Sequence, residues 1–327
     1  MTLDEFKTLV RRAEVDIAQR PRAYRLRLFG LAALGYGVVF GLGAIAITLL
    51  GGSIALAFYS TAWVMLLIQK KLIFALVAIL WVLFKALWIR IEPPQGVELQ
   101  RQDFPVLFAE LDQLRAALRA PRLQRVLLTP QLNAAVVRTP RLGVLGWHRN
   151  TLVLGIELLM VLSPSEAKAV LAHELGHLSG RHNRFSAWIY SVRAMWSVLM
   201  ETYDRQSGFA AGWLRRFLDW YAPRFNAYSF ALARQNEYEA DHLSAAFTSA
   251  DDAVRALVNV HVTGPFIDEH FWREFYRQAD HSESPVVMPY SGLQAFLHAH
   301  PLSQEEQQLR LANVLEVDTS YDDTHPC

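Results

Sequence analysis

Residues 163–180 read SPSEAKAVLAHELGHLSG, and this stretch decides the fold of the second half of the chain. Ser163 is a typical helix N-cap, Pro164 suits the first helical position, and Glu166 completes a capping box with Ser163. Glycine is the residue type that most often follows a helix, and Gly180 stands where this one should stop. The pattern predicts a helix that begins at Pro164 and ends just before Gly180.

The same helix carries an H-E-x-x-H sequence, in which His173 and His177 are four residues apart. Residues at this spacing project from one helical face, so both imidazoles can bind one metal ion while Glu174 lies beside its open coordination position. A catalytic zinc usually has three protein ligands and a water molecule. The only cysteine, Cys327, is the last residue, which excludes a site of several thiolates and leaves histidines and carboxylates as ligands.

A third ligand is expected downstream of the motif. Residues 224–250 can form a helix after Pro223, and within them Glu237-Tyr-Glu-Ala-Asp241 places two carboxylates four residues apart. Glu237 can bind the metal while Asp241 accepts a hydrogen bond from a ligating imidazole. Such a cluster alone would indicate a solvent-exposed acidic face. Together with the upstream H-E-x-x-H sequence, it is the best ligand candidate in the chain.

A long apolar region precedes these motifs. Residues 28–50 contain no charged side chain, and a helix needs roughly 20 such residues to cross a bilayer. Residues 51–53, Gly-Gly-Ser, predict a turn. Residues 54–91 form a second apolar segment, which is either one long helix or two shorter spans divided at Lys70 and Lys71. A single long helix is favoured because the segment contains no turn-forming residue, and a transmembrane hairpin results.

The segment before the apolar region is amphipathic and basic. Thr2 and Glu5 have capping-box spacing, which predicts a helix that lies either at the membrane surface or packed on the protein. Basic residues are concentrated on this flank: Lys7, Arg11, Arg12, Arg20, Arg22, Arg25 and Arg27. By the positive-inside rule, a hairpin then places both the N-terminus and the main domain in the cytoplasm.

The rest of the chain has the mixed composition of a globular domain. Leucines at helical spacing predict a helix after Pro105, and short apolar runs predict strands at 125–128, 134–137 and 151–154. The fold class is α+β, mainly α. The expected organisation is an amphipathic segment (1–27), a transmembrane hairpin of two or three spans (28–91), a catalytic domain (92–317) and a polar tail (318–327).

Bulk composition excludes several classes of protein. The chain has 32 basic and 31 acidic residues and is 52% hydrophobic, so it is neither disordered nor a nucleic-acid binder by charge. Only 19% of the residues are charged, which is low for a soluble enzyme and favours a membrane protein. The sequence does not indicate an oligomeric state.

The HELGH helix, the E-Y-E-A-D segment sixty residues after His177 and the N-terminal hairpin together resemble the HtpX and CAAX prenyl protease family of membrane-bound zinc metallopeptidases, which are gluzincins. Asn133, Ala134 and Ala135, with the strand at 151–155, resemble the region that supplies the sheet edge beside the family's active-site cleft. The resemblance implies a zincin-like domain whose small sheet packs on the HELGH helix.

The resemblance also implies roles for individual residues. His173, His177 and Glu237 would bind one Zn²⁺ per chain, Asp241 would support a ligand, and Glu174 would be the general base of a zinc metalloendopeptidase acting on proteins or peptides. His300 and Pro301 match a late family motif and suggest oxyanion stabilisation by His300. A role in membrane-protein quality control follows from the resemblance alone.

Two departures from the family pattern are visible. A second membrane hairpin would be expected between the HELGH helix and the glutamate, but residues 185–230 are too rich in arginine and are expected to form helices outside the bilayer core. Arg310 also follows His300 later than the usual spacing. The alternative interpretation is a catalytically inactive, membrane-anchored protein that binds zinc or partners.

Overall fold

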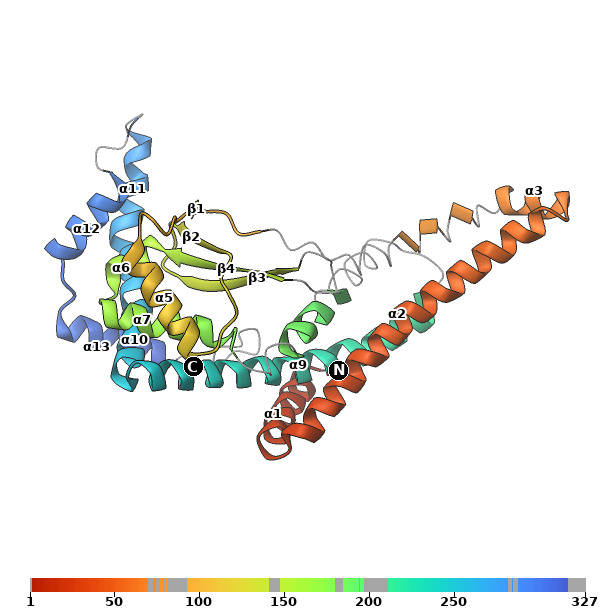
Figure 1. Ribbon diagram of the computed structural model, residues 1–327, viewed down its shortest axis with the longest axis horizontal. Coiled ribbons are helices and arrows are strands. Elements are labelled where there is room, and N and C mark those ends of the chain that lie inside the picture. Colours follow the sequence, from red (N-terminus) through yellow and green to blue (C-terminus); the bar gives the residue numbers. More distant parts are fainter. Residues whose placement is uncertain are drawn as a thin grey trace. The chain divides into compact units, whose positions relative to one another are not determined.

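The computed structural model describes residues 2–69, 73–74, 77–78, 80–81, 93–140, 148–179, 185–193, 195–196, 211–281, 284 and 288–316, and these are mainly helical with one small sheet (Figure 1). The chain divides into two compact units. Unit 1 consists of residues 1–91, 140–148 and 184–235, and unit 2 of residues 92–139, 149–183 and 236–327. Unit 1 thus includes residues 184–235, which the sequence analysis grouped with the catalytic domain.

Unit 1 begins with two helices that form a buried contact. In α1 (Leu3–Gln19), Thr2 and Glu5 form the predicted capping box, and the face with Val10, Ala13 and Ile17 is buried. This helix therefore packs on the protein, which was one of its two expected positions. Helix α2 (Pro21–Ala57) buries one stripe of side chains, namely Tyr24, Leu28, Ala32, Gly35, Val39 and Ala46. Among the described residues, it alone is long and apolar enough to cross a membrane.

The turn after the first apolar segment lies later than predicted. Helix α2 continues through Gly51 and Gly52 to Ala57, and α3 (Thr61–Gln69) follows a turn at residues 58–60. The hydroxyl of Ser60 accepts a hydrogen bond from Trp63 N–H at 3.3 Å and so caps α3. Two glycines weaken a helix but do not by themselves end it, whereas a capping side chain starts the next one. The remainder of the second apolar segment lies largely outside the described residues.

The central part of unit 1 is aromatic. Trp196 and Tyr221 are buried with Tyr24 and Leu28 in one cluster, so these two aromatic side chains are part of the core of this unit. Helix α9 (Ala211–Phe247) begins upstream of Pro223, which lies inside the helix, so the expectation that the helix starts after the proline was wrong. An internal proline costs about 3 kcal/mol, and burial of its aromatic neighbours offsets that cost.

Unit 2 contains a four-stranded mixed sheet in the order β1-β2-β4-β3. Its strands are β1 (Val97–Glu98), β2 (Arg125–Thr129), β3 (Ala134–Pro140) and β4 (His148–Gly155). Strands β1 and β2 are antiparallel with Val97 opposite Leu128, and β2 and β4 are parallel with Arg125 opposite Thr151. The three predicted strands are confirmed, while β1 is too short to have a sequence pattern. Strand β3 is an edge of this sheet.

Helices α5 (Pro105–Ala117), α6 (Ile156–Val161) and α7 (Pro164–Gly176) belong to the same unit, as does the end of α9. Leucines of α5 and α7 share one buried cluster with side chains of β2 and β4. The remaining helices are α10 (Ala250–Ile267), η2 (Asp268–Trp272), α11 (Arg273–Arg277), η3 (Gln278–Asp280), α12 (Pro289–Ala299) and α13 (Gln304–Leu315).

Helix α7 starts as predicted and ends earlier. The Ser163 hydroxyl accepts a hydrogen bond from Glu166 N–H, and the Glu166 carboxylate accepts one from Ser163 N–H, so the capping box is present. The helix ends at Gly176, three residues before the predicted last residue Ser179, because the last turn of the chain is tighter than an α-helix. Leu178 and Ser179 donate backbone hydrogen bonds to residues three positions earlier, a spacing typical of a last helical turn.

Candidate metal centre

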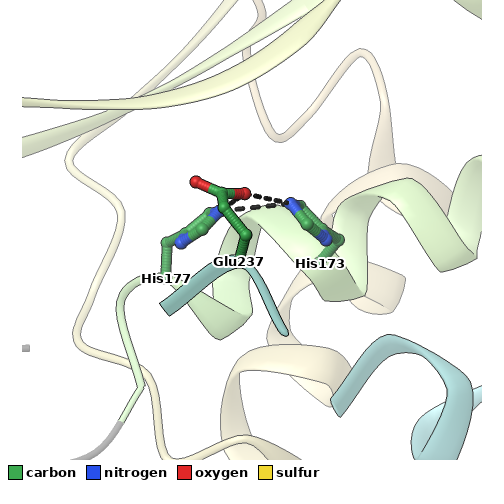
Figure 2. A group of neighbouring side chains, drawn as sticks. All are labelled: His173, His177 and Glu237. Atoms are coloured by element: carbon green, nitrogen blue, oxygen red, sulfur yellow. Dashed lines mark hydrogen bonds and ion pairs between the residues drawn. The ribbon is translucent and has the colours of Figure 1, made fainter. Parts of the chain in front are cut away.

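Helix α7 and the part of α9 that belongs to unit 2 supply the predicted ligands. Helix α7 carries His173, and His177 follows as its C-cap residue one turn later, while Glu237 comes from α9. Their side chains point toward one another in Figure 2. Within the described part of the chain, they are the only group of His, Cys, Asp and Glu side chains able to share a metal ion, with ligand atoms within 4.8 Å of one another. The structure thus brings together the three residues that the sequence singled out.

The three facing atoms form a nearly equilateral triangle. Nε2 of His173 lies 3.1 Å from Nε2 of His177, and Oε2 of Glu237 lies 3.5 Å and 3.3 Å from these two nitrogens (Figure 2). Zinc bonds of about 2.0–2.1 Å at tetrahedral angles separate ligand atoms by about 3.3–3.4 Å. The donor types and their spacing therefore fit a zinc ion with three protein ligands.

Asp241 orients one of these imidazoles. Nδ1–H of His173 donates a hydrogen bond to Oδ1 of Asp241 at 2.8 Å, which leaves Nε2 of the ring to face the other two donors. Burial of the ring opposes its positive charge, but hydrogen bonds to Asp241 and Glu237 outweigh burial and raise the pKa of His173 to about 10. A metal ion that binds Nε2 must therefore displace a proton at neutral pH.

Glu174 lies next to His173 on α7 and contacts the sheet. Its Oε2 accepts a hydrogen bond of 3.1 Å from the backbone N–H of Val136 in β3. Burial raises the pKa of Glu174, which brings its proton affinity closer to that needed for proton transfer near neutral pH. Sequence reasoning missed the contact with Val136, because nearly every residue has a backbone N–H group and the pattern of side chains does not show which one is used.

Small residues allow α7 and α9 to approach closely at the centre. A Cβ atom on Gly176 would lie 3.3 Å from Cα and 3.5 Å from Cβ of Ala240, a tighter contact than side chains usually make. One turn further along α9, the buried Ser244 hydroxyl donates a hydrogen bond of 2.7 Å to the carbonyl oxygen of Ala169. These two contacts hold the part of α9 that carries Glu237 against the part of the chain that carries the histidines.

A comparison with families of known proteins bears on this arrangement. The model of peptidase family M48 matches residues 117–317, which is more than half of the chain and includes every residue of the candidate centre. The chain belongs to peptidase family M48. No curated protein and no solved structure matches it significantly. Because members of the M48 family are zinc-dependent metallopeptidases in general, the triangle of His173, His177 and Glu237 is the candidate metal site of this M48 peptidase.

The residues that resemble a late family motif lie at the end of α12 and in α13. His300 caps the end of α12, its ring stacks on Phe296 with a centroid distance of 4.7 Å, and its Nδ1 lies 3.2 Å from the Phe296 carbonyl oxygen. Arg310 pairs with Glu269 at 3.0 Å and lies over the ring of Phe266. None of these contacts between described residues reaches the candidate metal centre, so oxyanion stabilisation by His300 stays a prediction.

Proposed function

We propose that this M48 peptidase is a membrane-anchored, zinc-dependent endopeptidase of the HtpX and CAAX prenyl protease type. The observation that carries the proposal is the triangle of two imidazole nitrogens and one carboxylate oxygen, with the carboxyl group of Glu174 on the neighbouring position of the same helix. A structural metal site needs no such carboxyl group, whereas peptide hydrolysis requires a base beside the reacting water.

His173, His177 and Glu237 would hold the zinc ion. When bound, zinc supplies a Lewis acid that polarises the scissile carbonyl and makes water acidic enough to lose a proton near neutral pH. Glu174 accepts that proton and later gives it to the leaving amine. The hydrogen bond from Val136 N–H holds Oε2 of Glu174, which leaves Oε1 as the oxygen that takes up the proton. Asp241 keeps the proton of His173 on Nδ1.

Strand β3 offers a surface for an extended substrate. The carbonyl of Asn133 accepts a hydrogen bond from Gly155 N–H at the end of β4, whereas Val136 N–H points to Glu174. Since backbone groups alternate along a strand, those of Ala134, Val136 and Arg138 face away from β4. A peptide that pairs with this edge is held mainly through its backbone, which gives affinity with little demand on sequence.

The membrane part of the proposal rests on α2. This helix of 37 residues has the length and hydropathy of a membrane span, and many of its large side chains are exposed, among them Phe29, Phe40, Ile45, Ile47 and Leu49. Exposed apolar side chains at this density favour lipid over water as their surroundings. A hairpin with a cytoplasmic catalytic domain and a role in membrane-protein quality control extend the same proposal.

Substitution of Glu174 by glutamine tests the proposed chemistry. The Glu174→Gln variant should bind zinc like the wild type and cleave a denatured, labelled casein at least about 100-fold more slowly, since general acid–base catalysis contributes about that much or more. Glu239→Gln is the matched control, because Glu239 is an exposed carboxylate on α9 two residues from Glu237. It should leave both zinc content and cleavage unchanged.

Two outcomes would contradict the proposal. Equal cleavage by the wild type and the Glu174→Gln variant would show that another group is the base. A wild-type chain that contains stoichiometric zinc but cleaves no denatured substrate would favour the alternative, an inactive zinc-binding protein in the membrane.

A further inference from the structure

A hollow in unit 2 is lined by residues that play no part in the candidate metal centre. It has a volume of about 450 Å³ and lies between the turn before α5, the side of α5 that carries Phe108, Leu111 and Arg115, and the start of β2. A hollow of this size falls in the range of small-molecule sites. Three arginines line it, Arg101, Arg115 and Arg122.

The three arginines are held by separate pieces of backbone. Arg101 lies in a turn that Gln100 closes by accepting hydrogen bonds from two following backbone N–H groups. Arg115 belongs to α5. Arg122 lies in the segment after α5, and its carbonyl oxygen accepts hydrogen bonds from the side chains of Gln124 at 3.1 Å and Asn150 at 3.0 Å. The guanidinium groups are therefore brought to one hollow by a fixed framework.

The charge of the lining is unbalanced. Asp112 is the only acidic residue of the lining, and it pairs with Arg101 at 2.7 Å and with Arg115 at 3.7 Å. Three positive charges thus face one negative charge, and no acidic partner of Arg122 is found among the described residues. Like charges in a hollow with apolar walls create a positive potential that a bound anion would neutralise.

The remaining lining is apolar. Leu111 and Val126 are buried, Leu123 is partly buried, and the ring of Phe108 lies under the guanidinium of Arg101 at 4.9 Å. An inorganic anion alone would leave this floor without contact, whereas an apolar ligand alone would leave the positive charge without a partner. Only a ligand with both an anionic group and an apolar body contacts the arginines and the apolar floor at the same time.

We propose that the hollow formed by Arg101, Arg115, Arg122 and Phe108 binds a small amphipathic oxyanion, a molecule with a phosphate or carboxylate head and an apolar body. The head lies at the guanidinium groups, whose paired N–H donors match the oxygens of such a group. The apolar body lies against Phe108, Leu111 and Leu123. This site is independent of the metal centre and of peptide hydrolysis.

Phenyl phosphate is the probe for this site, titrated calorimetrically into the full-length protein in a neutral detergent. Inorganic phosphate and phenol represent its two halves and should each bind at least tenfold more weakly. Arg122→Ala should weaken phenyl phosphate binding at least tenfold, and Arg122→Lys should weaken it less, because lysine keeps the charge but lacks the planar fork. Arg125→Ala is the matched control, since Arg125 pairs with Glu98 at 3.0 Å outside the hollow and should not matter.

The outcomes distinguish binding in this hollow from binding elsewhere on the protein. Binding of phenyl phosphate that is equal in the wild type and in the Arg122→Ala variant, as expected for an anion at the metal centre, would overturn the proposal, and so would no saturable binding. Equal affinity for inorganic phosphate would overturn the amphipathic part. A water-soluble short-chain phosphatidate, titrated in parallel, identifies the source: tighter binding than phenyl phosphate assigns the site to a lipid headgroup, and weaker binding to a free small molecule.

Discussion

A single hydrogen bond determines which nitrogen of His173 is available to a metal ion. Nδ1 of His173 lies 2.8 Å from Oδ1 of Asp241, and this hydrogen bond keeps the proton on Nδ1. We predict that Asp241→Ala weakens zinc binding by about 10- to 100-fold, because supporting partners of ligating histidines usually contribute that much. Asp241→Asn should lose less zinc affinity, since its carboxamide oxygen still accepts the hydrogen bond. Zinc affinity is measured by competition with a chromogenic chelator.

Glu239→Ala serves as the control for this change. Glu239 lies two residues from Asp241 on α9, and its side chain is exposed. Removing it alters the charge of the same segment without touching His173. Equal zinc affinity in the Asp241→Ala and Glu239→Ala variants would show that Asp241 acts only through its charge.

Glu157 is a buried carboxyl group away from the metal centre. Burial raises the pKa of Glu157 above its ordinary value of 4.5, and the negative charge of Asp268 adds to the effect, although the Trp272 indole donates a hydrogen bond to it. The folded protein therefore holds this proton more tightly than the unfolded chain. Stability contributed by the neutral form is present below pH 4.5 and is lost as the pH rises through the raised pKa.

We predict that Glu157→Gln raises the midpoint of thermal unfolding at pH 7 and has little effect at pH 4. Glutamine carries no charge and still accepts the indole hydrogen bond. A shift of about 2–4 °C is expected for each kcal/mol gained in a domain of this size. Glu269→Gln is the control, because Arg310 lowers the pKa of the exposed Glu269 and no rise should follow. An equal effect of Glu157→Gln at both pH values would contradict the prediction.

Individual residues differ in how far sequence alone could assign them. His173, Glu174 and His177 follow from local spacing, because a helix brings residues four apart onto one face. Glu237 follows only from the need for a third ligand. The contact of Val136 with Glu174 and that of Trp272 with Glu157 join segments far apart in the chain, and no local pattern marks either of them.

At the scale of elements, the metal centre depends on how closely α7 approaches α9. A Cβ atom on Gly176 would lie 3.3 Å from Cα of Ala240, so a larger side chain forces the two helices to shift. We predict that Gly176→Val separates the helices near Glu237 and reduces zinc binding at least tenfold, while the far-ultraviolet circular dichroism stays helical. Zinc content after dialysis against a weak chelator provides the measurement.

Gly264 on α10 provides the matched glycine. A Cβ atom there would lie 3.7 Å from Leu132 Cδ2, an ordinary contact, so Gly264→Ala should be tolerated. It should even stabilise the protein by about 0.4–1 kcal/mol, because alanine restricts the unfolded chain. If Gly176→Val retained zinc as well as Gly264→Ala did, the close approach of α7 and α9 would not be what positions Glu237.

The elements also show where local signals stop being sufficient. The Ser163 capping box marks the start of α7 because both of its hydrogen bonds form within four residues. Pro223 suggested a helix start, yet α9 passes through it. Packing of Tyr221 and Phe225 in the aromatic cluster outweighs the local preference, and such long-range packing is absent from the sequence pattern.

The two compact units of the molecule do not follow the order of the segments along the chain. Sequence composition suggested a membrane region followed by a separate catalytic domain. In unit 1, however, Tyr24 and Leu28 of α2 are buried with Tyr221 and Phe225 of α9, nearly two hundred residues later. Arg234 of α9 also pairs with Glu14 of α1 at 2.7 Å. The N-terminal helices therefore cover part of the chain that follows the HELGH motif.

This organisation predicts that residues 92–327 do not form a soluble protein on their own. Removing residues 1–91 exposes the fully buried Tyr221 and Phe225 and takes away the carboxylate that pairs with the buried Arg234. A buried charge that loses its carboxylate partner and a new apolar patch both destabilise a fold and promote association. Expression of the truncated chain should give aggregates, whereas the full chain should stay in the membrane fraction after an alkaline wash. Size-exclusion chromatography with light scattering distinguishes the outcomes, and a monomeric, zinc-loaded truncated chain would mean that unit 2 folds without the N-terminal helices.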